Sequence, residues 1–146
     1  MPSLPREIPV CKLPPELTSL NALRGFVTVQ AQHAGLAEEE CALLTVAVAE
    51  VFTNIVRHAR GIQAGAEVLL SSHFAAKTLA LQVQYAGEAF APPEQSEDTD
   101  FAAFQEGGFG LTIIQKVCDQ VEYLHHQGIN TVRLHRALPA PLEPQS

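Results

Sequence analysis

The chain has 146 residues, of which 47% are hydrophobic, and its formal net charge is −7. This length predicts one domain with a sizeable core, and the negative charge argues against a nucleic-acid-binding protein. No apolar run approaches the roughly 20 residues that span a bilayer, and the N-terminus lacks the apolar centre of a signal peptide. The three cysteines are widely spaced among apolar residues, as in reduced, buried thiols. We therefore expect a cytoplasmic domain that binds neither nucleic acid nor membranes.

The N-terminal part of the chain predicts an edge strand and two helices. The proline-rich start leaves room only for an edge strand over residues 7–13. From Pro15 apolar residues recur at three- and four-residue spacing, which predicts a helix that Gly35 ends as the C-cap. The acidic residues 38–40 suit the first turn of a second helix, because negative charge is favourable near a helix N-terminus. That helix is expected to continue to about Arg60.

The apolar period then changes to two. Residues 68–72 and 79–85 alternate between apolar and smaller or polar side chains, which predicts two strands joined by a turn near residues 75–77. Residues 91–106 contain two prolines and five acidic residues and have no sustained apolar period. A loop of this length inside a compact domain is usually functional or disordered.

A glycine-rich stretch at residues 107–110 opens a third helix, in which apolar residues as far as Val121 are expected to face inward. Two more strands are predicted at residues 121–125 and 131–136, joined by a turn at Gln127–Gly128. Hairpins with interspersed helices predict an α/β two-layer sandwich, with a mixed, mostly antiparallel sheet covered by helices on one face.

The domain boundaries follow from this order of elements. Residues 1–14 are expected to be an N-terminal extension with the edge strand, and residues 15–137 to be the folded domain. Residues 138–146 hold three prolines and are expected to be a disordered tail.

The second helix carries a polar row. Glu50, Asn54 and His58 recur every four residues and therefore lie on one face of the helix. Taken alone, such a row is equally well interpreted as a helix edge that faces water. The glycine-rich stretch adds a second signal, because a helix N-terminus presents unpaired amides to an anion. Together they suggest a phosphate near residues 107–110 and a magnesium ion near Asn54, with Glu50 positioned to accept a proton.

Two motifs carry a resemblance to a known family. The stretch AVAEVFTNIVRHA, residues 47–59, resembles the N-box of the GHKL ATPase superfamily, and GGFGLTIIQKVCDQVEY, residues 107–123, looks like its G2 box and the following helix. Within that superfamily the chain is similar to the bacterial anti-sigma-factor serine kinases, whose first helix bears an arginine, here Arg24. The resemblance covers residues 15–136, nearly the whole chain.

The resemblance implies a Bergerat-type sandwich that binds ATP with Mg²⁺. It implies that Asn54 coordinates the magnesium, that Glu50 is the general base for a target serine, and that His58 has a structural role near the ATP pocket. The implied partners are a sigma factor and an anti-sigma-factor antagonist bearing that serine, with a homodimer as a further option. Residues 91–106 would form a lid, and its hinge would consist of Gly107, Gly108 and Gly110.

One family motif is altered. Residues 85–90, YAGEAF, stand where the family has D-x-G-x-G: Gly87 is kept as a nucleotide-binding residue, Tyr85 replaces the aspartate and Ala89 the second glycine. The family's aspartate accepts a hydrogen bond from the adenine amino group, and such a charge-assisted bond is worth about 1.5–3 kcal/mol. We therefore expect weakened ATP binding. The alternative to an active serine/threonine-protein kinase is a pseudo-kinase, that is, a protein-binding regulatory module.

Overall fold

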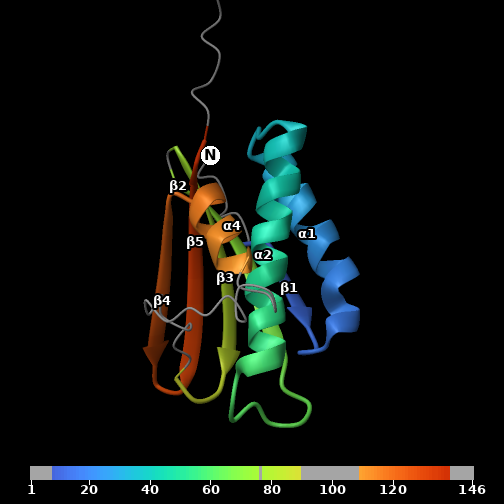
Figure 1. Ribbon diagram of the computed structural model, residues 1–146, viewed down its shortest axis with the longest axis vertical. Helices are drawn as coiled ribbons and strands as arrows, with labels where there is room; N and C mark the ends of the chain where they lie inside the picture. The colour runs from blue at the N-terminus through green and yellow to red at the C-terminus, as the bar shows by residue number, and fades with distance from the viewer. Residues whose placement is uncertain (1–7, 76, 90–108, 139–146) are drawn as a thin grey trace, which may run out of the picture.

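The computed structural model describes residues 8–75, 77–89 and 109–138. These residues form two layers, a five-stranded sheet and three α-helices that cover one of its faces (Figure 1). The predicted fold class, an α/β two-layer sandwich with helices on one face, is confirmed. The elements are β1 (Val10–Leu13), the 3-10 turn η1 (Leu17–Ser19), α1 (Leu20–His33), α2 (Glu38–His58), β2 (Val68–Ala75), β3 (Thr78–Ala86), α4 (Phe109–Val117), β4 (Gln120–His126) and β5 (Ile129–Ala137).

The strand order in the sheet is β1-β2-β3-β5-β4, and every pair is antiparallel. The sheet of the described strands is thus wholly antiparallel, where a mixed, mostly antiparallel one is expected from the sequence. The central pair joins β3 to β5, with Tyr85 opposite Asn130. Buried and half-buried residues alternate along β3, so that one face of the strand packs under the helices. The predicted turn at Gln127–Gly128 is confirmed, since both residues have positive φ, as a two-residue hairpin turn requires.

The helices contribute the other half of the core. Val27 on α1 and Phe52 and Ile55 on α2 are completely buried. Gly35 ends α1 as predicted: at φ +88° it allows the Leu36 amide to donate to the Ala31 carbonyl oxygen at 3.1 Å. None of the described helices is long and apolar enough to cross a bilayer.

Three predicted helix boundaries are wrong by a few residues. The first helix begins at Leu20 rather than Pro15, after a 3-10 turn in which the Ser19 hydroxyl donates to the Pro14 carbonyl oxygen at 2.9 Å. The second ends at His58 rather than Arg60, because Ala59 is extended. The third ends at Val117, and Val121 instead lies in β4, opposite Leu134. In each case a turn or strand contact takes the backbone out of the helical path.

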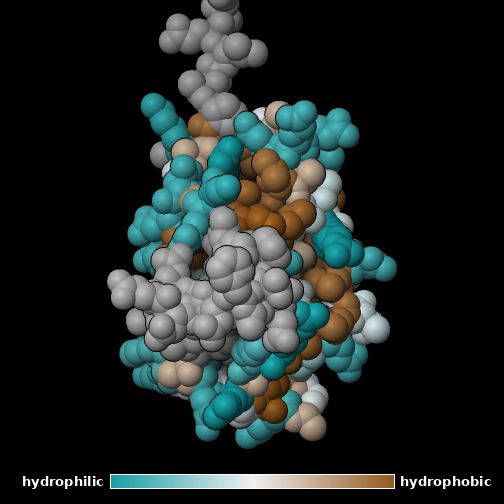
Figure 2. Space-filling model, in the orientation of Figure 1, coloured by the Kyte–Doolittle hydropathy of each residue, from teal (hydrophilic) through white to brown (hydrophobic). Residues whose placement is uncertain are grey.

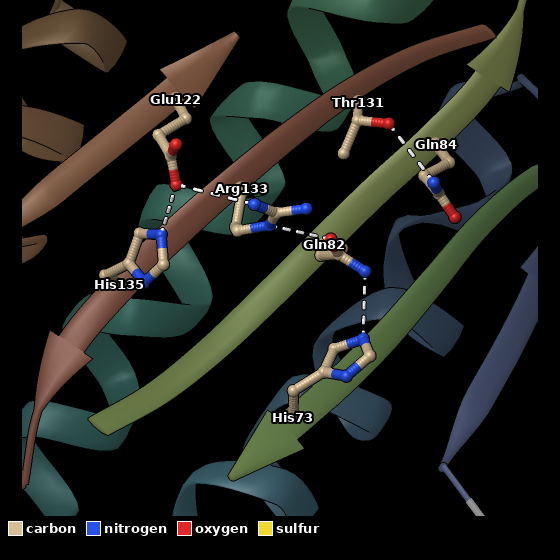
Figure 3. Close-up of polar contacts among 7 residues, drawn as sticks. All are labelled: His73, Gln82, Gln84, Glu122, Thr131, Arg133 and His135. Carbon is tan, nitrogen blue, oxygen red and sulfur yellow. Dashed lines mark hydrogen bonds and ion pairs between the residues drawn. The ribbon is translucent and has the colours of Figure 1, made fainter. Parts of the chain in front are cut away.

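The exposed face of the sheet carries a polar network across four strands (Figure 3). Gln82 donates to His73 at 2.9 Å and accepts from the Arg133 guanidinium at 2.7 Å. Glu122 pairs with His135 at 2.6 Å and with Arg133 at 3.7 Å. These side chains satisfy one another, so this face presents a bonded polar surface.

The cysteines agree only in part with the prediction of buried thiols. All three are free; Cys41 and Cys118 are buried as predicted, whereas Cys11 is only half-buried. Burial raises the pKa of Cys118 to about 12, so this thiol stays protonated at neutral pH.

Candidate functional site

The polar row of α2 is available for binding. Glu50 and Asn54 are half-buried, and His58 is exposed in the last turn of the helix. Within the described part of the chain, none of the three side chains makes a hydrogen bond or an ion pair. A carboxylate and an amide one helical turn apart, both free and partly shielded from water, are suited to a ligand.

Helix α4 packs beside α2 (Figure 1). Helix α4 ends at Val117, and β4 starts soon after it at Gln120, so the C-terminal end of α4 lies near the start of β4. The first turn of α4 is at the other end of the helix, beside the middle of α2 (Figure 1). Gly110 belongs to that first turn. Gly107, Gly108 and the loop at residues 91–106 lie outside the described residues. Their position opposite Glu50 therefore stays a prediction.

Tyr85 is the last residue but one of β3 and belongs to the hydrophobic core. Only 3% of its surface is exposed, and its hydroxyl oxygen has no hydrogen-bond partner in the described part of the chain. A buried hydroxyl left unpaired costs roughly 1–3 kcal/mol and is uncommon. Burial also raises the pKa of Tyr85 to about 12, so the group is neutral. The ring is thus part of the core rather than of an open cleft.

Gly87 is held on both sides by other backbone groups. Its amide donates to the Gly128 carbonyl oxygen at 3.0 Å, and the neighbouring Glu88 amide donates to the Arg60 carbonyl oxygen at 2.9 Å. A Cβ at Gly87 would lie 3.0 Å from that same Arg60 oxygen, which is closer than carbon normally comes to backbone. A glycine at this position therefore permits a close backbone approach that a larger residue would disturb.

Asn130 supports this turn and was missed by the sequence analysis. It is 2% exposed, and its amide donates to the Glu88 carbonyl oxygen at 2.8 Å and more weakly to that of Gly87 at 3.5 Å. His125 reaches the Gly87 oxygen at 3.3 Å. The two-residue period of β5 could have identified Asn130. It is two and four residues before the buried Val132 and Leu134, so its side chain lies on the same, inward face of the strand.

The two sides of the site differ in how they suit Mg-ATP. Magnesium prefers oxygen ligands and keeps several water molecules, so the free Asn54 amide oxygen is suited to hold the metal at one end of the site. The Glu50 carboxylate, one turn earlier, is suited to accept a proton. At the other end, the Tyr85 hydroxyl is neutral and enclosed. The Tyr85 hydroxyl therefore cannot replace the family's aspartate, whose charged carboxylate accepts a hydrogen bond from the adenine amino group.

Comparison with known sequences supports one family. Residues 13–136 match the histidine kinase-like ATPase domain. The chain is similar to the serine-protein kinase RsbW of Listeria innocua serovar 6a, with 29% identity over 127 residues, covering 81% of this chain and 78% of the relative. It is also similar to the protein of the same name in Listeria monocytogenes serotype 4a, with 28% identity over the same coverage.

Comparison with solved structures shows the same fold. The RsbU and RsbW domains of a Mycobacterium tuberculosis protein superpose with a TM-score of 0.63 at 14% identity, over 92% of this chain and 32% of that one. The histidine kinase domain of a blue-light-activated kinase from Erythrobacter litoralis superposes with a TM-score of 0.52 at 20% identity, over 82% of this chain and 61% of that one. The chain thus spans about a third of the mycobacterial structure and somewhat under two thirds of the other.

Proposed function

Because the chain belongs to the histidine kinase-like ATPase domain family, we propose that it is an anti-sigma-factor-type regulator. In this proposal the domain binds Mg-ATP and phosphorylates a serine of an anti-sigma-factor antagonist, and it also binds a sigma factor. The N-box and G2 resemblance supports the proposal, as does the similarity to relatives named serine-protein kinases.

The observation that carries the kinase proposal is the free pair on α2. Bound Mg-ATP would supply the phosphoryl group and leave as Mg-ADP, and its magnesium ion would offset part of the phosphate charge. Asn54 would hold the metal through its amide oxygen, and Glu50, one turn earlier, would accept the proton of the attacking serine hydroxyl. Both side chains are half-buried and without partners in the described residues, so neither must break a contact before it acts.

Tyr85 favours a second candidate function, a pseudo-kinase that acts only by binding proteins. Its ring is in the core and its hydroxyl is neutral and enclosed, which removes the charged acceptor that would select adenine. In this alternative the same surfaces bind the sigma factor or the antagonist, and phosphate is not transferred at a useful rate.

Calorimetric titration with Mg-ATP and Mg-ADP distinguishes the two functions. We expect binding weaker than micromolar, lost in Asn54→Ala and kept in Glu50→Gln, because only the amide is proposed to hold the metal. Incorporation of labelled phosphate into a co-purified antagonist should then require Glu50. No detectable nucleotide binding, with the antagonist still bound, would favour the pseudo-kinase.

Pull-down from the source cells tests the partners independently of nucleotide. We expect a sigma factor or its antagonist to co-purify with or without ATP. Recovery of neither class, together with a different stable partner, would contradict the proposed anti-sigma role.

A further inference from the structure

The C-terminal end of α4 is joined to the end of β5 by hydrogen bonds. The Arg136 guanidinium donates to the carbonyl oxygen of Val117, the last residue of α4, at 2.7 Å. The Asp119 amide donates to the His135 carbonyl oxygen at 2.8 Å, and the Asp119 carboxylate accepts from the Ala137 amide. The turn after α4 is therefore fixed to the strand that lies beside β4 in the sheet.

Arg136 also reaches the second helix. A guanidinium nitrogen of Arg136 lies 3.8 Å from the carboxylate of Glu40, which belongs to the first turn of α2. The side chains of Arg136 and Glu40 are 26% and 37% exposed. An ion pair of this exposure contributes little by itself, but a charge-assisted hydrogen bond to the last carbonyl group of a helix also fixes a direction. One side chain of β5 thus contacts both α4 and α2.

The charges around Arg136 make its contacts difficult to replace. The C-terminal end of α4 carries a partial negative charge from its carbonyl groups, and the nearby Glu40 carboxylate is also negative. The Arg136 guanidinium is a cation that contacts both. If a neutral side chain replaced it, the helix end and the carboxylate would remain near each other without that positive charge. The substitution would therefore remove two contacts and add repulsion between α4 and α2.

Hydrophobic packing alone does not set the direction of α4. Ile114 and Val117 of α4 are buried in the core, and Figure 2 shows further hydrophobic side chains over the N-terminal half of α2. Hydrophobic contact is not directional. A helix of nine residues is roughly 13 Å long, so a rotation of about 10° around its C-terminal end moves its first turn by roughly 2 Å. A directed bond at the C-terminal end therefore controls where the N-terminal amides of α4 lie.

We propose that Arg136 is a positioning residue of the nucleotide site. By joining the C-terminal end of α4 to the first turn of α2, Arg136 sets where α4 presents its own first turn, beside the middle of α2 (Figure 1). The inference rests on the proposed function, because it takes the first turn of α4 to be the part that meets the phosphates of Mg-ATP. Arg136 acts through α4 and not through contact with the nucleotide. A displacement of about 1 Å in such a site can reduce a rate about a hundredfold.

Arg133 provides a matched control. It lies on the same strand, its side chain is 34% exposed, and it likewise makes a hydrogen bond, with Gln82 at 2.7 Å, and an ion pair, with Glu122 at 3.7 Å. These contacts lie on the face of the sheet that the helices do not cover (Figure 3). Arg136→Gln and Arg133→Gln therefore each remove a hydrogen bond and an ion pair, but only Arg136→Gln should release α4.

The test measures hydrogen exchange of the α4 amides without nucleotide, and calorimetric binding of Mg-ATP, on the full chain. We expect Arg136→Gln to speed exchange in α4 at least about tenfold and to weaken Mg-ATP binding at least about fivefold. Arg133→Gln should change neither quantity by more than about twofold. Arg136→Lys should recover part of both, because an ammonium group can donate to the Val117 carbonyl oxygen but lacks the fixed fork of a guanidinium.

The outcomes separate this inference from the proposed function. Unchanged exchange in Arg136→Gln, or equal changes in Arg133→Gln, would overturn the inference, because Arg136 would then not hold α4 specifically. Faster exchange in Arg136→Gln with wild-type affinity for Mg-ATP would also overturn it, since the direction of α4 would not matter to the site. No binding of Mg-ATP by the wild-type chain would instead overturn the proposed nucleotide site and, with it, the positioning role.

Discussion

The α2 row and the end of β3 are two parts of one candidate site, yet they are built differently. Glu50 and Asn54 are half-buried side chains without partners in the described residues. Tyr85 is enclosed in the core, and Gly87 is tied by backbone hydrogen bonds to Gly128 and, through Glu88, to Arg60. The first region resembles a binding surface that folding leaves free, and the second resembles a packed part of the core.

This difference indicates how the two regions should respond to substitution. A free side chain on a helix surface contributes little to stability, so its replacement should affect ligands only. A buried ring or a glycine in close backbone contact contributes to the fold itself, so its replacement should affect stability first.

Tyr85→Asp should have the largest effect. Loss of the ring leaves a cavity and places a carboxylate in the core, so we expect a loss of about 3–5 kcal/mol in the free energy of unfolding. In the molecules that remain folded, the restored acceptor should raise ATP affinity by up to about 2 kcal/mol. Urea denaturation and calorimetry measure both effects. Tyr85→Phe is the control, expected to be neutral or stabilising because it removes an unpaired hydroxyl.

A contradictory result for Tyr85 is easily recognised. If the wild-type chain already binds ATP tightly and Tyr85→Asp leaves the affinity unchanged, residues 85–90 do not form the part of the site that binds adenine.

Gly87→Val should come next, with a loss of about 2–3 kcal/mol in the free energy of unfolding. Its Cβ would press on the Arg60 carbonyl oxygen, 3.0 Å away, and backbone cannot easily move. The matched control is Gly25→Ala, where the added Cβ meets nothing and helix propensity should stabilise the fold by up to about 1 kcal/mol. Similar losses at both glycines would show that the close approach at Gly87 has no energetic importance.

Alkaline pH should weaken the fold through two buried groups. Burial raises the pKa of Tyr85 from 10.0 to about 12 and that of Cys118 from 9.0 to about 12. Above pH 9 the unfolded chain therefore loses these protons before the folded chain does. The stability contributed by these two protonated groups should be fully present below about pH 9 and be lost between pH 9 and 12, as urea midpoints measured across that range would show. Tyr85→Phe should make the fall shallower; an unchanged slope would contradict the burial of the hydroxyl.

Asn54→Ala should have the smallest effect on folding, within about 0.5 kcal/mol, because its side chain is free in the described structure. The same substitution should abolish Mg-ATP binding in calorimetry. A large loss of stability would instead mean that Asn54 supports the core.

Much of the fold was predictable because its signals are local. The change from helical to two-residue periodicity predicts the three α-helices and the strands β2 to β5, while the proline-rich start predicts β1 as an edge strand; η1 is not predicted. The positive-φ residues Gly35 and Gly128 lie at the expected turns. The errors lie at helix ends. Pro15, Arg60 and Val121 were placed in helices, but turns or strand pairing at those points replace the helical hydrogen bonds.

The sequence by itself determined the candidate row on α2, because the four-residue spacing of Glu50 and Asn54 places them on one helical face in any fold. Only the tertiary structure decided the state of the other end. The enclosure of the Tyr85 ring depends on the sheet packing under α2, and the support of Gly87 comes from Asn130, which is 43 residues away along the chain. Such contacts arise when strands β3 and β5 pair, and no local pattern of residues specifies them.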